Sequence, residues 1–343
     1  MPKLNHEISI GIVTDSHSGK YDDNIVDKDG FVTRKGIVGF LKEKADSGSL
    51  DAIVFNGDAP SDISAPTDAH FLEICRLLAI YDKIGIPVFW LPGNYEDYFA
   101  YNTSFRLKDE SLENVIDVST TGKCAFNGYD LIFVPGSREF SRGFRVYENV
   151  KTGVQVTAQQ TSSGTSYNTF YTFNPADLSD LVEVENPDRT VIFTHNPPSF
   201  KPDKGAVNRY SIDLAVNAQD DKDNMYAGLG AHQFIREGKA KPVVMHAGNE
   251  YLAFMCRRLG IRYLFSGDIH EAAGMITDIN GNPIREGVYS PQLFATPGAA
   301  LDGNYGIATF RDDGTASFTR YNVTGMKVDY VNDLIPNFRE RII

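Results

Sequence analysis

Cysteine is scarce in this sequence: its 343 residues include only Cys75, Cys124 and Cys256. The three are odd in number and far apart, which excludes a disulfide framework and a metal site built from thiolates. We interpret all three as reduced residues of a protein core. This interpretation predicts a cytoplasmic location.

Long apolar runs are also missing. No stretch approaches the roughly 20 apolar residues that a membrane-spanning helix needs. The residues before the first predicted strand, 1–7, are too few for a secretory signal peptide. We therefore expect neither a membrane-spanning segment nor a membrane partner.

Positive charge is in short supply. The chain has 33 Lys and Arg residues against 45 Asp and Glu residues, which gives a formal net charge of −12. Because binding to nucleic acid depends on many contacts from Lys and Arg to phosphates, this composition argues against nucleic acid as a partner. An excess of carboxylates also suits a protein that uses them to bind metal ions.

The first hundred residues read as repeated βα units. Apolar, β-branched runs predict buried strands in the stretch 8–17, where the strand ends before Asp15-x-His17, and at 51–56 and 87–91. Apolar stripes at helical spacing predict helices between them at 33–46 and 67–84. Such units form a parallel sheet, and open α/β sheets hold ligands at the edge where the carboxyl ends of the strands meet.

Each of these strands ends in polar residues that carry chemistry. Two later predicted strands, at 190–194 and 262–265, end in the same way. The ordered set is Asp15-x-His17, Gly57-Asp58, Gly93-Asn94, His195 and Gly267-Asp268-x-His270. A single Asp-x-His occurs often by chance, but five such strand ends in one chain predict a constellation of ligands at one sheet edge.

We interpret residues 1–343 as a single domain with two insertions, at 138–173 and 199–241. The first is polar and aromatic with strand-like alternation, so we expect a protruding β structure, and a homo-oligomer formed through it is left open. Residues from His246 to about 259 are expected to form a helix, and those from 274 to 322 short antiparallel strands.

The ordered motifs resemble those of the calcineurin-like metallophosphoesterase family, whose pattern runs D-x-H, GD, GNH followed by an acid, H, and G-H-x-H. The resemblance spans residues 8 to about 310. The run from His195-Asn196-Pro197-Pro198 through His246-Ala247-Gly248 to Gly267-Asp268-Ile269-His270-Glu271 also resembles branches that read H-x-PP, H-x-G and GHIHE. The resemblance implies an α/β fold, an αββα sandwich of two mixed sheets flanked by helices.

The resemblance also implies a centre of two divalent metal ions. Asp15, His17 and His270 would bind the first ion, Asp58 would bridge the two, and Asn94, His195 and Asp268 would bind the second. A donor set without sulfur suits Mn, Fe or Zn, with Mn and Fe favoured. The implied reaction is hydrolysis of a phosphodiester or phosphomonoester by attack of a metal-bound hydroxide.

Asp268 stands where the family usually has His. A carboxylate can coordinate the same ion, and it makes the site harder, which favours Mn or Fe. The alternative is a weakened second site. We favour a ligand because Gly267 and His270 keep the family's spacing on either side.

Tyr95 stands where the family often has a His that protonates the leaving group. Tyrosine, with a pKa near 10, is a poor acid at neutral pH, and loss of general-acid catalysis costs roughly 10²- to 10⁴-fold. Either His246 or Glu96 substitutes for it, or the substrate has a good leaving group. His246 could equally orient other residues of the site.

These observations predict a metal-dependent phosphohydrolase that acts on a small phosphorylated substrate such as a nucleotide; a nuclease fits the acidic charge less well. The alternative is a catalytically weakened binding or scaffold protein that kept the fold and lost turnover through Tyr95 and Asp268. Metal content separates the two, since a scaffold would hold fewer than two ions.

Overall fold

The computed structural model describes most of the chain. The described residues are 7–17, 19–26, 28, 32–60, 67–93, 95–96, 112–118, 122–134, 155–161, 164–170, 184–198, 210–214, 242–246 and 250–325.

The run at residues 8–13 forms β1 (Ile8–Val13), an interior strand of a six-stranded sheet. It pairs in parallel with β4 (Ala52–Asn56) on one side and antiparallel with β17 (Asn304–Phe310) on the other. The strand order is β18 (Ala316–Asn322), β17, β1, β4, β5 (Val88–Leu91) and β6 (Val115–Asp117). This is the first sheet.

The second sheet also has six strands. Its order is β15 (Ile276–Thr277), β16 (Leu293–Ala295), β14 (Tyr263–Ser266), β11 (Thr190–Thr194), β8 (Tyr129–Val134) and β7 (Lys123–Phe126). The inner strands β8, β11, β14 and β16 are parallel, and the two edge strands are antiparallel to their neighbours. The carboxyl ends of β11 and β14 therefore lie at one edge.

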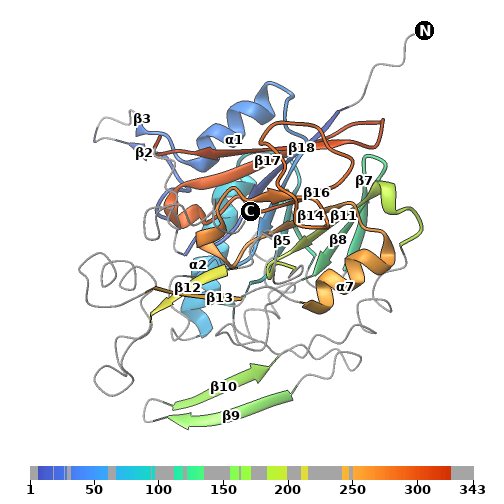
Figure 1. Cartoon of the computed structure of the whole chain (residues 1–343). Coiled ribbons are helices and arrows are strands. Elements are labelled where there is room, and N and C mark those ends of the chain that lie inside the picture. The colour runs from blue at the N-terminus through green and yellow to red at the C-terminus, as the bar shows by residue number, and fades with distance from the viewer. Residues whose placement is uncertain are drawn as a thin grey trace.

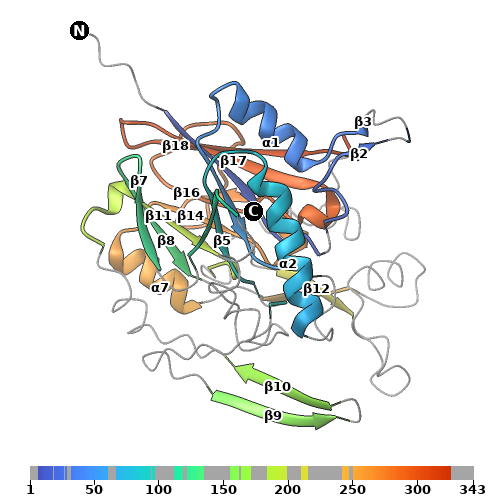
Figure 2. The ribbon, with the colours of Figure 1, turned by 180° about the vertical axis from the view of Figure 1, so that it is seen from behind.

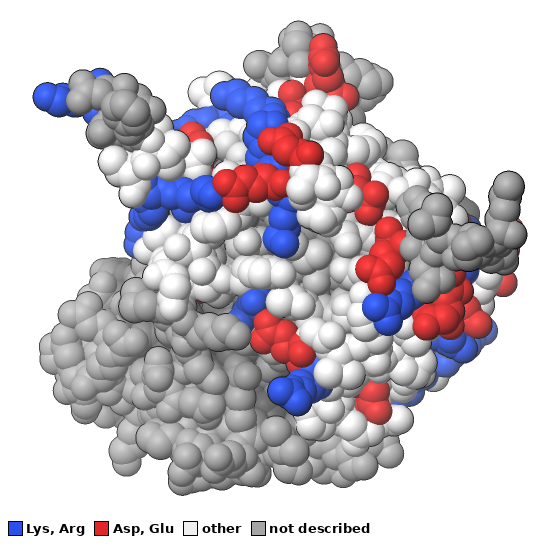
Figure 3. All heavy atoms as spheres, turned by 90° about the horizontal axis from the view of Figure 1, so that it is seen from above, with Lys and Arg blue, Asp and Glu red and all other residues white. Residues whose placement is uncertain are grey.

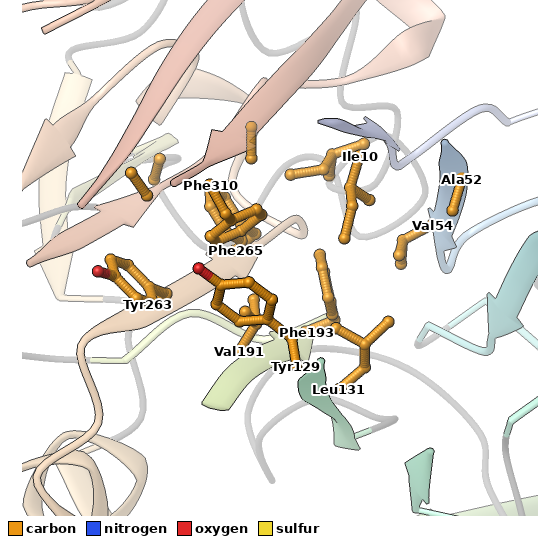
Figure 4. Close-up of a cluster of buried hydrophobic side chains, with 14 of the residues drawn as sticks. Ile10, Ala52, Val54, Tyr129, Leu131, Val191, Phe193, Tyr263, Phe265 and Phe310 are labelled. Atoms are coloured by element: carbon orange, nitrogen blue, oxygen red, sulfur yellow. The ribbon is translucent and has the colours of Figure 1, made fainter. Parts of the chain in front are cut away.

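The core between the two sheets follows the two-residue period of strands. On β4, Val54 packs into the cluster between the sheets, whereas Ile53 and Phe55 pack on the opposite face. From the second sheet, Phe193 and Phe265 enter the same inter-sheet cluster, and their rings stack with centroids 5.6 Å apart. Figure 4 shows these side chains meeting between the strands.

Helices cover the outer face of each sheet (Figures 1 and 2). Helices α1 (Ile37–Asp46) and α2 (Thr67–Asp82) pack on the first sheet, for example through Leu41 and Leu78. Helix α7 (Glu250–Leu259) packs on the second sheet through Leu252 and Met255. Helix, sheet, sheet and helix thus form four layers, and the predicted αββα sandwich is confirmed.

Two helix boundaries differ from the prediction. Helix α1 begins at Ile37 rather than near residue 33, because Val32–Arg34 forms β3 and pairs with β2 (Ile25–Val26). The helix expected from His246 begins instead at Glu250. Residues Pro242–His246 form β13, which pairs antiparallel with β12 (Tyr210–Leu214).

Within the predicted insertion 138–173, the structure describes the hairpin of β9 (Gln155–Thr161) and β10 (Gly164–Phe170). Both ribbon views place it at the lower end of the molecule, apart from the two large sheets. Most of the insertion at 199–241 lies outside the described residues. The described residues also form short turns of 3₁₀ helix at Pro187–Arg189, His270–Ala272 and Ala300–Asp302.

The three cysteines are free thiols, with Cys75 and Cys256 buried and Cys124 half-buried. Each packs with one of the apolar clusters, as the sequence predicted. None of the helices in the described part of the chain has the length and hydropathy to cross a membrane.

Candidate metal centre

The strand ends of the two sheets bring six predicted ligands together. Two groups have potential ligand atoms that all lie within 4.8 Å of one another: Asp15, His17 and His270, and Asp15, Asp58 and His195. Asp268 joins them, because its Oδ1 lies 4.0 Å from Nε2 of His195. The cluster therefore draws on β1, β4, β11 and β14, two strands from each sheet.

The distances place Asp58 between the two histidine groups. Its Oδ2 lies 3.3 Å from Nε2 of His195 and 3.9 Å from Nε2 of His17. Asp15 also faces both sides, with Oδ1 at 3.6 Å from Nε2 of His270 and 3.9 Å from Nε2 of His195. Contacts of this length leave room for a cation among the donors, which is the arrangement that a bridged pair of ions requires.

Backbone hydrogen bonds hold the first two loops of the site in register. The N–H of Asp15 donates to the carbonyl of Gly57 at 2.9 Å, and the N–H of His17 donates to the carbonyl of Asp58 at 3.1 Å. Across the sheets, the N–H of Asp268 donates to both carboxylate oxygens of Asp15, at 3.2 and 3.1 Å. The loops therefore support one another across the two sheets.

The glycines of the strand-end motifs permit this close approach. A Cβ added to Gly57 would lie 2.4 Å from the backbone nitrogen of Gly93, and one added to Gly267 would lie 1.9 Å from Oγ1 of Thr14. Any side chain at either position would push two strand ends of the site apart. This packing explains why a glycine precedes the acid in the Gly57-Asp58 and Gly267-Asp268 motifs.

Backbone strain concentrates in the ligand residues. The φ angles of Asp15, His17, Asp58 and Asp268 are 55°, 42°, 57° and 66°, all in the left-handed region. Residues other than glycine seldom adopt this region, and such strain persists where the surrounding structure enforces it, often at functional sites. Four of the five non-glycine residues with positive φ in the described part of the chain belong to the cluster.

Two histidines of the cluster, His17 and His195, are oriented as metal ligands are. Nδ1 of His195 lies 2.8 Å from the carbonyl oxygen of Asn56, and Nδ1 of His17 lies 3.1 Å from the carbonyl oxygen of Pro60. A carbonyl oxygen can only accept, so in each ring Nδ1 carries the proton and Nε2 faces the carboxylates. Such a carbonyl partner fixes the tautomer of a metal-binding histidine. The residues present therefore fit a pair of divalent cations.

Electrostatics point the same way. Burial would lower the pKa of His195, but the carboxylates of Asp58, Asp15 and Asp268 outweigh burial and raise it to about 10. Burial, helped by the charges of Asp58 and Asp15, raises the pKa of Asp268 to about 6 against the effect of His195. Three carboxylates lie at close range and are shielded from solvent, so they repel one another, and a bound cation would offset that repulsion.

Comparison with known proteins identifies the family. The family model described as calcineurin-like phosphoesterase matches residues 8–272. This chain belongs to the calcineurin-like phosphoesterase family. The matched segment includes β1, β4, β11 and β14 and every residue of the cluster.

Solved structures with similar folds share little sequence with this phosphoesterase-family chain. One matches with a TM-score of 0.53 at 9% identity, covering 93% of this chain and 100% of its own, and it supports the fold alone. The protein TT1561 of Thermus thermophilus matches at 10% identity and a TM-score of 0.47, covering 93% and 100% of the two chains. A dimetal phosphatase from Danio rerio matches at 11% identity and a TM-score of 0.46, covering 92% and 99%. A search among curated proteins found no match.

Glu96, the acid after the family's GNH position, is held by backbone N–H groups, and its role as a proton donor stays a prediction. It is fully buried, and its carboxylate accepts hydrogen bonds from three backbone N–H groups, those of Asp58 at 3.2 Å, Ala59 at 2.8 Å and Gly93 at 2.6 Å. Burial and the charge of Asp58 raise the pKa of Glu96 to about 7. The geometry favours a different role: Glu96 ties the Asp58 loop to the Gly93 loop.

Tyr95, at the family's acid position, lies against a predicted ligand. Its ring meets the ring of His17 edge to face, with centroids 4.5 Å apart, and its backbone N–H donates to Oδ1 of Asp58 at 2.8 Å. Asn94, the neighbouring predicted ligand, lies outside the described residues. His246 ends β13, and its side chain also lies outside the described part, so the roles assigned to both residues stay predictions.

Two residues that sequence reasoning missed belong to the site's surroundings. Nδ2 of Asn196 donates to Oδ2 of Asp268 at 2.7 Å. Asp22 is fully buried and accepts hydrogen bonds from the hydroxyls of Ser16, between two predicted ligands, and Tyr81 of α2. Asn196 follows His195 directly, and that adjacency was the one available signal; nothing in the sequence marked Asp22.

Proposed function

We propose that this chain hydrolyses a phosphodiester or phosphomonoester at a centre of two divalent metal ions. One observation carries the proposal: Nε2 of His195 faces the carboxylates of Asp15, Asp58 and Asp268, while its Nδ1 is held by a backbone carbonyl. Membership in the calcineurin-like phosphoesterase family supports the same class of reaction.

Each ion has a proposed donor set. Asp15, His17 and His270 would hold the first ion, and His195, Asp268 and Asn94 would hold the second. Asp58 would bridge them, because its Oδ2 is close to a histidine of each set. Oxygen and imidazole donors without sulfur favour Mn or Fe over a thiolate-seeking ion.

Bound at these positions, divalent ions would lower the pKa of a water molecule and neutralise the charge of phosphate oxygens. The protein's own contribution is to fix the donors before the substrate arrives, through the backbone contacts of His17 and His195 and the carboxylate of Glu96. Such preorganisation is a large part of enzymatic rate enhancement.

We propose direct attack of water-derived hydroxide on phosphorus. Ser16 lies between Asp15 and His17, but its hydroxyl donates to the buried Asp22 and is not placed as a nucleophile. The new P–O bond forms as the P–O bond to the leaving group breaks, and the leaving oxygen gains a proton. Tyr95 at the acid position favours leaving groups that need little protonation, such as a phosphoanhydride or an aryl ester.

The proposed substrate is small, such as a nucleotide. The net charge of −12 opposes a polyanionic substrate. Figure 3 shows basic and acidic side chains interspersed over the described part of one face, without a field of basic residues. The cytoplasmic location stays a prediction from the free cysteines, and oligomerisation through the 138–173 insertion stays a prediction from sequence.

The test combines metal content with turnover. Purified protein would be stripped with a chelator and reloaded with Mn²⁺, Fe²⁺ or Zn²⁺, and assayed on bis-p-nitrophenyl phosphate, p-nitrophenyl phosphate and a nucleoside diphosphate. We expect about two ions per chain and hydrolysis that needs them, lost in Asp58→Asn. A protein with fewer than two ions and no metal-dependent hydrolysis would contradict the proposal and support the scaffold alternative.

A further inference from the structure

The two oxygens of the Asp268 carboxylate have different neighbours. Its Oδ2 accepts the hydrogen bond from Nδ2 of Asn196, at 2.7 Å. Its Oδ1 lies on the side of His195, 4.0 Å from Nε2. The side chain is only 8% exposed, so solvent competes little for either oxygen. The carboxylate can therefore offer one defined oxygen to a cation.

The backbone around Asn196 is tied to the same neighbourhood. Thr194 donates its hydroxyl to the carbonyl of Asn196 at 2.8 Å, and the N–H of Gly267 donates to the carbonyl of His195 at 3.0 Å. Asn196 is only 3% exposed. Its amide is thus aimed at Asp268 by a backbone that is fixed on the ends of β11 and β14.

The amide of Asn196 makes one side-chain hydrogen bond within the described part of the chain, the one to Asp268. Its Oδ1 is buried and has no hydrogen-bond partner there. Buried polar groups are normally hydrogen-bonded, and among the described residues the bond to Asp268 is the one that orients this amide. An amide also donates without adding charge, whereas Lys or Arg would neutralise Asp268 and repel a cation.

We infer that Asn196 is a positioning residue for Asp268, and that the pair takes the place of the imidazole found there in relatives with G-H-x-H. A carboxylate is shorter and freer to rotate than an imidazole, so it needs a partner that fixes its rotamer. The resulting second position is richer in oxygen, which shifts its preference toward Mn²⁺ relative to a position that holds an imidazole. The inference rests on the proposed two-ion centre but not on any substrate.

The experiment measures binding of Mn²⁺ and Zn²⁺ to the chelator-treated full chain by competition with a fluorescent chelator. In Asn196→Ala we expect the affinity for the second Mn²⁺ to fall roughly 10- to 100-fold, with the first unchanged, as for other lost partners of metal ligands. Asp268→His should shift the second site toward Zn²⁺. Asn114→Ala is the matched control, since its Nδ2 donates to a backbone carbonyl, that of Asp82, away from the site.

A double-mutant cycle separates positioning from general stability. In the Asp268→His background, Asn196→Ala should cost little further affinity, because the carboxylate it holds is gone. Equal losses in both backgrounds, or two normal Mn²⁺ sites in Asn196→Ala, would overturn the inference. If Asn196→Ala does not fold, the isosteric Asn196→Asp tests the same contact with Asp268, because it replaces the donor with an acceptor. A wild-type protein that binds fewer than two ions would overturn the proposed function as well.

Discussion

The imidazole of His195 is anchored by Asn56: Nδ1 lies 2.8 Å from the carbonyl oxygen of Asn56. The contact is reciprocal between the two sheets, because Nδ2 of Asn56 donates to the carbonyl of Thr194 at 2.8 Å. The last residue of β4 and the first residue after β11 thus lock the first sheet to the second at the site. That lock aims Nε2 of His195 at three carboxylates.

Replacement of His195 should remove one metal ion. We expect His195→Ala to hold about one divalent ion per chain, against two in the wild type, because Asp15, His17 and His270 remain to bind the first. Elemental analysis of the reloaded protein measures this directly. His70→Ala, in the first turn of α2, should keep both ions. Retention of two ions in His195→Ala would contradict the proposed ligand set.

Glu96→Gln should destabilise the protein rather than alter its choice of leaving group. The amide nitrogen of Gln would face a backbone N–H, and one buried hydrogen bond would be lost, so we expect the free energy of unfolding to fall by about 1–3 kcal/mol. Urea unfolding with the metal chelated measures it. Glu43→Gln, on the exposed face of α1, should change stability by less than about 0.5 kcal/mol.

The same variant tests the alternative role of Glu96. If its carboxyl donated the proton to the leaving group, Glu96→Gln would lose far more activity on alkyl phosphates than on p-nitrophenyl phosphate. We expect the ratio of the two activities to stay the same, because the carboxylate binds backbone N–H groups of the Asp58 and Gly93 loops.

Tyr95→His should restore protonation of poor leaving groups. We expect turnover of an alkyl phosphate to rise by up to about 10²-fold relative to p-nitrophenyl phosphate, since general-acid catalysis contributes about 10²- to 10⁴-fold. The comparison uses kcat/KM for both substrates. Tyr95→Phe, which keeps a ring against His17 but has no acid, should leave the ratio unchanged. An unchanged ratio in Tyr95→His would contradict the hypothesis that the site lacks a general acid at this position.

Asp22 should make stability fall as pH rises from about 4 to about 6. Burial raises the pKa of Asp22 to about 6 from 3.8, although the hydroxyls of Ser16 and Tyr81 lower it. The folded protein therefore holds this proton more tightly than the unfolded chain, and the stabilisation present below the unfolded pKa is lost as pH passes the folded one. A pKa of about 6 in the folded protein, against 3.8 in the unfolded chain, corresponds to a contribution to the free energy of unfolding on the order of 3 kcal/mol.

Asp22→Asn removes the titrating group, so its unfolding free energy should depend less on pH than that of the wild type over this interval. Chemical denaturation at several pH values, with metal chelated, measures the difference. An exposed carboxylate at the far end of α1 gives the control: Asp46→Asn should follow the wild-type curve. Parallel curves for wild type and Asp22→Asn would show that Asp22 does not carry the effect.

Local pattern was sufficient to place the ligand-bearing strands. The apolar run of β1 could only be buried, and Asp15 and His17 follow it at the carboxyl end, as Asp58 follows β4. Parallel pairing of β1 with β4, and of β11 with β14, then brings their ends to common edges. The convergence of six predicted ligands followed from this geometry.

Contacts between distant segments could not be predicted from the sequence. The strand β13 ends at His246 where a helix was expected, because pairing with β12, about thirty residues earlier in the chain, decides its conformation. Asn196 and Asp22 carry no local pattern, and their importance lies in the residues that the fold sets against them, Asp268 and Tyr81.

The sequence by itself determined which strands are buried and which chemistry stands at their ends, because hydrophobic period and motif order are local properties of the chain. Only the tertiary structure decided how each ligand is held: Glu96 by backbone N–H groups, Asp268 by Asn196, His195 by Asn56. Hydrogen bonds of this kind join residues that are up to 139 positions apart, so their geometry exists only once the two sheets have packed together.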